Sequence, residues 1–189
     1  MVKPVITEAY RAEQVALHAT GQYGTTGARY GPMVAAVLKA CGATSLLDYG
    51  CGSRRSLLET LTLPEDVVYE GYDPAVPAYA EPPLPAELVC CIDVLEHIEP
   101  FMLDNVLEHL GELCDPFGVF TVHTGPAGKH LSDGRNAHLT QEPFSWWKPR
   151  LDRRFDLLDH KDIANGFAVL VRAKHALQDP SHVLFKLPF

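Results

Sequence analysis

The segment Ser45–Arg54 constrains the fold of this chain more than any other. An apolar run ends at Asp48, and two glycines, Gly50 and Gly52, follow before the chain continues into a Leu-Leu pair. This order predicts a buried strand, a tight turn and the start of a helix. Glycine allows a sharp turn and close approach of a ligand, and N–H groups at a helix start favour a polar or anionic ligand group. The same turn also occurs where backbone merely packs on backbone, so the turn alone does not show that a ligand binds here.

Strand-like and helix-like runs alternate along the rest of the chain. The predicted strands lie at 45–48, 67–73, 88–93, 119–123, 155–158 and 167–171, and the predicted helices at 5–19, 32–41, 57–61, 99–114 and 144–151. Asn165 and Gly166 predict an antiparallel connection between the last two strands. Five prolines within 74–87 exclude a helix and a central strand there. The pattern predicts a doubly wound, Rossmann-like α/β fold: a mostly parallel sheet with a C-terminal antiparallel strand pair.

The chain has 189 residues, which suits a single domain. We expect N-terminal helices or a lid over 1–42, the sheet core over 45–172 and a tail over 175–189. The five cysteines have no Cys-x-x-Cys spacing, which predicts free buried thiols in a reducing, cytoplasmic environment. A net charge of −8 argues against a duplex nucleic acid partner. No signal sequence or membrane-spanning run is evident, so no membrane partner is expected.

Three predicted strands end in an acidic residue, namely Asp48, Asp73 and Asp93. The carboxyl ends of parallel strands share one edge of the sheet, where ligands of doubly wound folds bind. Asp73 follows Asp48 by 25 residues, about the spacing at which a carboxylate accepts hydrogen bonds from ribose hydroxyls. Each Asp taken singly could also cap a turn or helix. The set predicts polar partners along this edge.

These motifs resemble the class I S-adenosylmethionine-dependent methyltransferases. Residues 46–52 are similar to the first signature of that family, and the Asp-Val-Leu-Glu-His-Ile segment beginning at Asp93 resembles the segment after its fourth strand. Tyr-Gly-Thr-Thr-Gly at 23–27 and Asp-Gly-Arg-Asn-Ala-His at 133–138 are similar to small phage and bacterial methyltransferase-like proteins. The resemblance implies S-adenosylmethionine as cofactor, bound by Gly50, Gly52 and Asp73 with Asp48 and Asp93 nearby.

The sequence departs from the family pattern at two places. Arg54 replaces the third glycine of the signature, where it would either crowd the methionine end of the cofactor or point outward. Residues 74–87 leave no room for the helix, strand and helix that this family usually has between its second and fourth strands, so the resemblance implies a sheet that is shortened there. The adenine normally lies against that region, so Tyr79, Glu81 or Leu84 are candidates to contact it instead. We expect a shortened but working pocket.

Three histidines are candidates for the base that acts at the methyl acceptor: His97, His123 and His138. The first two follow strand ends, and His138 lies in a long polar loop over 124–142 that we expect to be a substrate lid. Candidate substrate-binding residues are Tyr23, His130, Arg135 and Asn136.

Asp93, Glu96 and His97 have the spacing i, i+3, i+4, which places all three on one face of a helical turn. With His138 they resemble the metal-binding segment of ubiquinone-pathway O-methyltransferases and small-RNA 3′-end 2′-O-methyltransferases. Many members of the superfamily share this segment without a metal, so we expect none.

The sequence thus predicts a methyltransferase that acts on an oxygen or nitrogen atom of a small or medium-sized acceptor. It is also compatible with a homodimer. One alternative is a non-catalytic S-adenosylmethionine-fold scaffold, and another is a metal-assisted O-methyltransferase. A nucleotide-dependent oxidoreductase is disfavoured because Ser53, Arg54 and Arg55 supply no third glycine for Gly-x-Gly-x-x-Gly.

Overall fold

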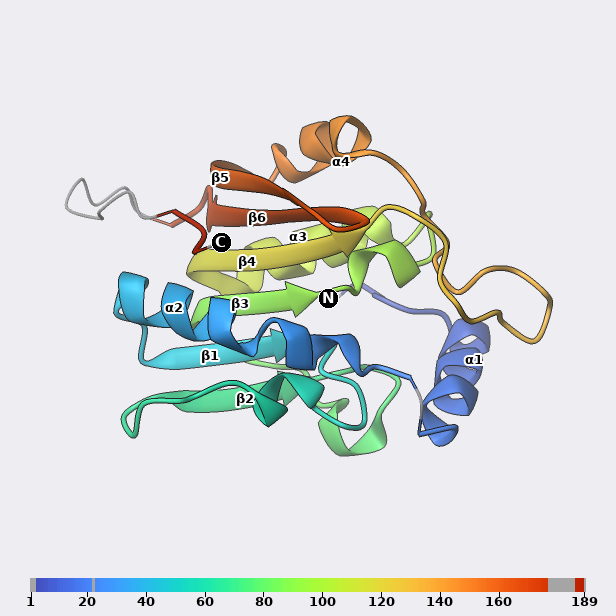
Figure 1. Cartoon of the computed structure of the whole chain (residues 1–189). Helices are drawn as coiled ribbons and strands as arrows, with labels where there is room; N and C mark the ends of the chain where they lie inside the picture. The colour runs from blue at the N-terminus through green and yellow to red at the C-terminus, as the bar shows by residue number, and fades with distance from the viewer. Residues whose placement is uncertain (1–2, 22, 177–185, 189) are drawn as a thin grey trace.

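A computed structural model describes residues 3–21, 23–176 and 186–188, which form a three-layer α/β fold around one sheet (Figure 1). The strand order is β2-β1-β3-β4-β6-β5, in which β1 to β4 pair in parallel and β6 is antiparallel to both β4 and β5. The predicted fold class is therefore confirmed. The strands are β1 (Ser45–Tyr49), β2 (Val68–Tyr72), β3 (Ala86–Ile92), β4 (Cys114–His123), β5 (Phe155–Ile163) and β6 (Gly166–Ala173).

Helices cover both faces of the sheet. One core cluster joins α2 to the side chains of Leu46, Leu88 and Val119, and the other joins α3 and α4 to alternate residues of the same strands. Because the strands are buried on both faces, their sequences are almost continuously apolar instead of alternating between apolar and polar residues. The helices are α1 (Glu8–Ala19), α2 (Gly31–Cys41), α3 (Leu103–Leu113) and α4 (Phe144–Leu151), with short 3₁₀ helices η1 (Thr26–Arg29), η2 (Ser56–Glu59), η3 (Pro77–Tyr79) and η4 (Leu95–His97).

Local sequence signals set several of these boundaries. The Thr7 hydroxyl accepts a hydrogen bond from Tyr10 N and caps α1, while Gly42 ends α2 at φ 66°. Asn165 adopts φ 64° between β5 and β6, at the predicted antiparallel connection.

The structure corrects two predicted elements. Instead of a short α-helix over 57–61, the chain forms η2, and Arg55 precedes it in the left-handed region at φ 48°. The strand β4 begins at Cys114, at the end of the predicted 99–114 helix, and that helix begins only at Leu103. Residues 74–87 contain η3 and no strand before Ala86, so β2 has β1 as its only paired neighbour among the described strands. Most of the predicted tail lies outside the described residues.

The helix α1 and the loop after β4 lie together beyond the carboxyl ends of the parallel strands (Figure 1). Tyr10, Leu131 and Ala137 form a small apolar cluster between them, and the Glu13 carboxylate accepts hydrogen bonds from Ser132. These two segments therefore roof the edge of the sheet where the sequence predicts a ligand. Among the helices of the described residues, none is long and apolar enough to cross a membrane.

Candidate active site

A cavity of about 410 Å³ lies between the carboxyl ends of the strands and this roof. The glycine turn, the strand-end acids and three histidines all line it, although they come from distant parts of the chain. The predicted residues in its wall are Tyr23, Asp48, Gly50, Gly52, Asp73, Asp93, His97, His123 and His138.

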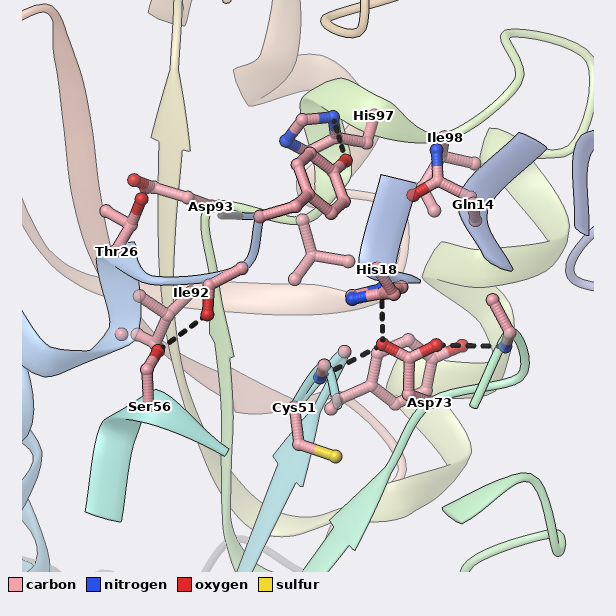
Figure 2. Close-up of a pocket in the computed structure, with 18 of the residues that line it drawn as sticks. Gln14, His18, Thr26, Cys51, Ser56, Asp73, Ile92, Asp93, His97 and Ile98 are labelled. Carbon is pink, nitrogen blue, oxygen red and sulfur yellow. Dashed lines mark hydrogen bonds and ion pairs between the residues drawn. The ribbon is translucent and has the colours of Figure 1, made fainter. Parts of the chain in front are cut away.

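The glycine turn forms the floor beside Asp73. Gly50 and Gly52 have φ values of +80° and +64°, which only glycine adopts at little cost. The N–H groups of Gly50 and Cys51 both donate to the carbonyl of Tyr72, at 2.7 and 3.1 Å. Figure 2 shows the sulfur of Cys51 pointing away from Asp73, so the turn presents backbone rather than side chains to the cavity.

Asp73 is held rigidly at the end of β2. Its two carboxylate oxygens accept the N–H groups of Gly52 and Ala75, at 3.0 and 2.9 Å (Figure 2). Burial raises the pKa of this carboxyl, while both N–H groups and the nearby His18 oppose that rise. A fixed, buried carboxylate with lone pairs toward a cavity is suited to accept hydroxyl donors.

Asp48 is occupied by the protein itself. The Tyr69 hydroxyl donates to one oxygen at 2.9 Å, and the Cys90 thiol lies 3.7 Å from the other. Burial raises the pKa of Asp48 to about 6. Asp48 lines the cavity, but these contacts indicate a role in fixing β1 against β2.

Asp93 follows β3 with φ 52°, an uncommon value for a residue with a side chain. The Thr121 hydroxyl donates to Asp93 Oδ1 at 2.6 Å, and Asp93 N lies 3.0 Å from the same hydroxyl. Burial raises the pKa of this carboxyl. Strained backbone held by side-chain contacts is typical of functional sites.

The three predicted histidines meet at the far end of the cavity from Asp73. The ring centroid of His138 lies 4.6 Å from that of His97 and 4.9 Å from that of His123. Nδ1 of His97 lies 2.8 Å from the Ala137 carbonyl, and Nδ1 of His138 lies 2.7 Å from the Gly125 carbonyl. A carbonyl only accepts, so we assign the proton of both rings to Nδ1, which leaves Nε2 with a free lone pair.

Burial keeps two of these imidazoles neutral. It lowers the pKa of His97 to about 3, and it also lowers the pKa of His138. The hydroxyl of Tyr23 lies 3.1 Å from His97 Nδ1 and adds to its fixed orientation.

Glu96 is fully buried behind these rings. One oxygen accepts the N–H of His123 at 2.9 Å, whereas Oε2 has no hydrogen-bond partner within the described residues. Burial raises the pKa of this carboxyl well above its usual range. Ligand atoms of Glu96, His97 and His138 lie within 4.8 Å of one another. Asp93, which the sequence spacing grouped with them, is not part of this cluster, because η4 is too short to form the predicted helical face.

Three of the predicted substrate-binding residues lie outside the cavity wall. His130 is exposed, and Arg135 is an exposed partner of Asp133 at 2.6 Å. The Asn136 side chain accepts the N–H groups of Ala127 and His138, each at 2.9 Å. It therefore positions the loop that carries His138, while the cavity is lined by residues 126–129 of the same loop.

The departures from the family pattern leave the cavity open. Arg54 points away from it, donates to the Gly21 carbonyl at 3.2 Å and pairs with Glu59 at 3.4 Å. Tyr79, Glu81 and Leu84 do not line the cavity, so the predicted substitute adenine contacts do not form within the described structure. Pro74 and Ala75, directly after Asp73, line it instead.

The sequence analysis missed Gln14 on α1, which lines the cavity together with His18 of the same helix. The available signal was polar residues at positions 10, 14 and 18, on one face of a helix.

Comparison with known protein families identifies the family of this chain. A family model described as a methyltransferase domain matches residues 20–168, well over half of the chain. The chain therefore belongs to this family, which confirms the predicted resemblance to class I S-adenosylmethionine-dependent methyltransferases. No curated protein sequence is significantly similar to this chain.

Several solved structures share the fold at low sequence identity. A Burkholderia thailandensis 1,6-didemethyltoxoflavin-N1-methyltransferase, with 1,6-didemethyltoxoflavin and S-adenosylhomocysteine bound, has a TM-score of 0.63 at 16% identity, over 92% of this chain and 93% of that chain. Human N-acetylserotonin methyltransferase, in complex with S-adenosylmethionine, has a TM-score of 0.56 at 16% identity, over 86% of this chain but only 56% of that chain. The 16S rRNA methylase ArmA has a TM-score of 0.53 at 15% identity, over 86% of this chain and 97% of that chain.

Proposed function

We propose that this protein transfers the methyl group of S-adenosylmethionine to an oxygen or nitrogen atom of a small or medium-sized acceptor. The observation that carries this proposal is the arrangement inside one cavity. A fixed carboxylate, Asp73, and a glycine turn lie at one end, and neutral imidazoles lie at the other.

The residues around Asp73 fit the proposed cofactor. The carboxylate would accept hydrogen bonds from the ribose hydroxyls, and the backbone of Gly50 and Gly52 leaves space beside it. A Cβ on Gly52 would lie 3.2 Å from the His18 ring, so a side chain there would crowd this space. The cofactor is a cation, and Asp48, Asp73 and Asp93 all line the cavity, which favours positive charge.

When bound, the cofactor supplies a methyl group on a sulfonium centre, which is displaced by a lone pair of the acceptor. The protein's main contribution is to hold the two reactants in line and to exclude water. An acceptor that carries a proton also needs a base. We assign this role to His138, whose Nε2 lone pair is free because Nδ1 faces the Gly125 carbonyl. His97, with its pKa near 3, is a weaker proton acceptor and is suited to orient the acceptor.

A small acceptor fits the cavity better than a polymer. The cavity is roofed by α1 and residues 126–129, and the chain carries a net charge of −8. The Burkholderia neighbour has 1,6-didemethyltoxoflavin bound, whereas ArmA is a 16S rRNA methylase. A polyanionic RNA acceptor would need a positive groove to offset its charge.

The base assignment is tested by comparing two variants of the same loop. Once a screen of hydroxyl and amine compounds finds an acceptor, His138→Gln should lower kcat by about 100-fold or more. His130→Gln, at an exposed position outside the cavity, should leave kcat within about twofold. Equal activity of the two variants would show that His138 is not the base.

A metal-assisted methyl transfer is the second candidate, and one observation favours it. Within the described residues Glu96 Oε2 is buried without a partner, and ligand atoms of Glu96, His97 and His138 lie within 4.8 Å of one another, with both rings held by backbone carbonyls. Two imidazoles and a carboxylate suit Zn²⁺ or Mn²⁺. Titration with either ion should then give binding that Glu96→Gln abolishes, since the variant still accepts the N–H of His123. Full activity after chelation in metal-free buffer would refute this candidate.

The location, domain organisation and oligomeric state of the protein are proposed mainly from its sequence. The five cysteines are all free, and four of them are buried, which supports a cytoplasmic location. A single domain over 1–189, a homodimer and kinship with phage proteins stay predictions of the sequence. A non-catalytic scaffold would follow only if neither cofactor nor product bound.

A further inference from the structure

The face of the helix α1 that is turned toward the cavity carries polar groups beside the ring of Tyr10, which also packs in the small apolar cluster. Tyr10, Gln14 and His18 occupy successive turns of one face, and Tyr10 and Gln14 are only 4% and 8% exposed. By contrast, Val15 on the same helix is 45% exposed. A helix that served only to cover a core would bury its apolar residues. This face therefore points to a polar group in the cavity beneath it.

Gln14 places an unused donor in the cavity wall. Its Nε2 is buried and has no hydrogen-bond partner within the described structure. The side chain lies near the phenols of Tyr10 and Tyr23, where it opposes the rise that burial causes in the pKa of both, but neither phenol is in hydrogen-bond geometry with Nε2. A buried N–H without an acceptor is costly, so an acceptor from a ligand is expected.

His18 places an unused acceptor one turn further along α1. Its Nε2 faces Asp73 Oδ2 at 3.9 Å, and its ring lies beside Gly52 (Figure 2). The carboxylate favours the tautomer with the proton on Nε2, which leaves a lone pair on Nδ1. This Nδ1 is also buried, and it has no partner among the residues that the structure describes. Burial lowers the pKa of His18, which agrees with a neutral ring.

The two unused atoms are complementary to the two charged groups of an amino acid. We infer that Gln14 and His18 bind the amino-acid end of the cofactor: its carboxylate accepts a hydrogen bond from Gln14 Nε2, and its ammonium donates one to His18 Nδ1. This inference deepens the proposed function and depends on it. The placement matches the order of groups in the cofactor, in which the amino-acid end follows the ribose: Asp73 would hold the ribose, and His18 lies directly beside Asp73.

The position of α1 does not depend on this pair of residues. Its start is held by Glu99, whose carboxylate accepts both the N–H and the hydroxyl of Thr7, at 2.9 and 2.8 Å. Its middle is held by the contact of Glu13 with Ser132. Replacing Gln14 by an apolar residue of similar size should therefore leave the helix in place.

The test compares two ligands that differ in the amino-acid end. S-adenosylhomocysteine carries it, whereas 5′-methylthioadenosine keeps the adenine, ribose and sulfur but lacks it. Calorimetric titrations would use the wild-type protein, Gln14→Leu, His18→Phe and the control Val15→Ala, with folding checked by circular dichroism.

Gln14→Leu should weaken S-adenosylhomocysteine by about 10- to 100-fold, the usual value of a hydrogen bond to a charged group, and methylthioadenosine by less than about threefold. His18→Phe should weaken S-adenosylhomocysteine more than methylthioadenosine, and Val15→Ala should change neither.

The inference is overturned if Gln14→Leu weakens both ligands equally, or neither. Should His18→Phe fail to fold, the Gln14→Leu comparison alone decides. A wild-type protein that binds neither ligand would overturn the proposed function itself and this inference with it. Tight binding of methylthioadenosine with no gain for S-adenosylhomocysteine would overturn the inference alone.

Discussion

Replacing Asp73 by asparagine separates the charge of this residue from its shape. The wild-type carboxylate accepts the N–H groups of Gly52 and Ala75 from within the protein and, in our account, the ribose hydroxyls of the cofactor. Asparagine fills the same space but offers one carbonyl acceptor, and its amide group would face a donor. Asp73→Asn should therefore impair ligand binding far more than folding.

The expected loss of affinity follows from the loss of the charged acceptor. Hydrogen bonds to a charged group contribute ~1.5–3 kcal/mol each, compared with ~0.5–1.5 kcal/mol for neutral ones. For two ribose hydroxyls the difference is about 2–3 kcal/mol, which corresponds to roughly 30- to 150-fold weaker binding.

The expected change in stability is smaller, because two effects oppose each other. One backbone N–H loses its acceptor, which costs about 1–3 kcal/mol, but the burial penalty that raises the pKa of Asp73 disappears. The free energy of unfolding should therefore fall by less than about 2 kcal/mol.

Calorimetry with S-adenosylhomocysteine and urea denaturation measure these two quantities. The exposed Asp66, just before β2, provides the control Asp66→Asn, which should change neither. A folded Asp73→Asn protein that binds S-adenosylhomocysteine within about threefold of wild type would refute the ribose assignment.

Three further substitutions test residues in and beside the glycine turn. In Gly50→Ala, the new Cβ would lie 2.8 Å from Val94 Cγ1 at φ +80°, whereas in the control Gly42→Ala it meets nothing within 4 Å at φ +66°. In urea denaturation, the free energy of unfolding should fall by about 1–2 kcal/mol for Gly42→Ala and by about 1–3 kcal/mol more for Gly50→Ala. Equal losses for the two variants would contradict the crowding at Gly50. Asp48→Asn tests pH dependence: because burial raises the pKa of Asp48 from 3.8 to about 6, the native state binds more protons than the unfolded state between these values, so wild-type stability falls as pH rises. At about 1.4 kcal/mol per pKa unit, the unfolding free energy of Asp48→Asn should gain ~2.4 kcal/mol on wild type between pH 4 and 7, and a constant difference would show that Asp48 is not the cause. Arg54→Gly should leave the Kd for S-adenosylhomocysteine within about threefold, since Arg54 points away from the cavity, and a large gain in affinity would show that it crowds the site.

The sequence predicted the order of elements and the edge of the sheet where the cavity lies. Both depend on local patterns, such as apolar runs ending in Asp48 and Asp73, or Gly42 after a helix. The direction of a side chain depends on its neighbours in space. Asp48 contacts Tyr69 because β2 lies beside β1, and no spacing along the chain reveals that contact.

The roof of the cavity was the hardest part to predict. The bend at Gly134, with φ +87°, returns the loop so that His138 enters the cavity while Arg135 stays exposed. Gln14 and His18 carry no family motif, and their role depends on where α1 packs. The polar spacing of α1 was visible in the sequence, but only the tertiary structure shows which face is buried.

Calorimetric titration of the wild-type protein with S-adenosylhomocysteine tests the central claim most directly. The account predicts micromolar or tighter binding with a stoichiometry of one per chain, because the Asp73 carboxylate, the glycine turn and the cavity are already formed. Absence of binding by a folded protein, under conditions where a known methyltransferase binds, would contradict it and leave the scaffold as the better explanation.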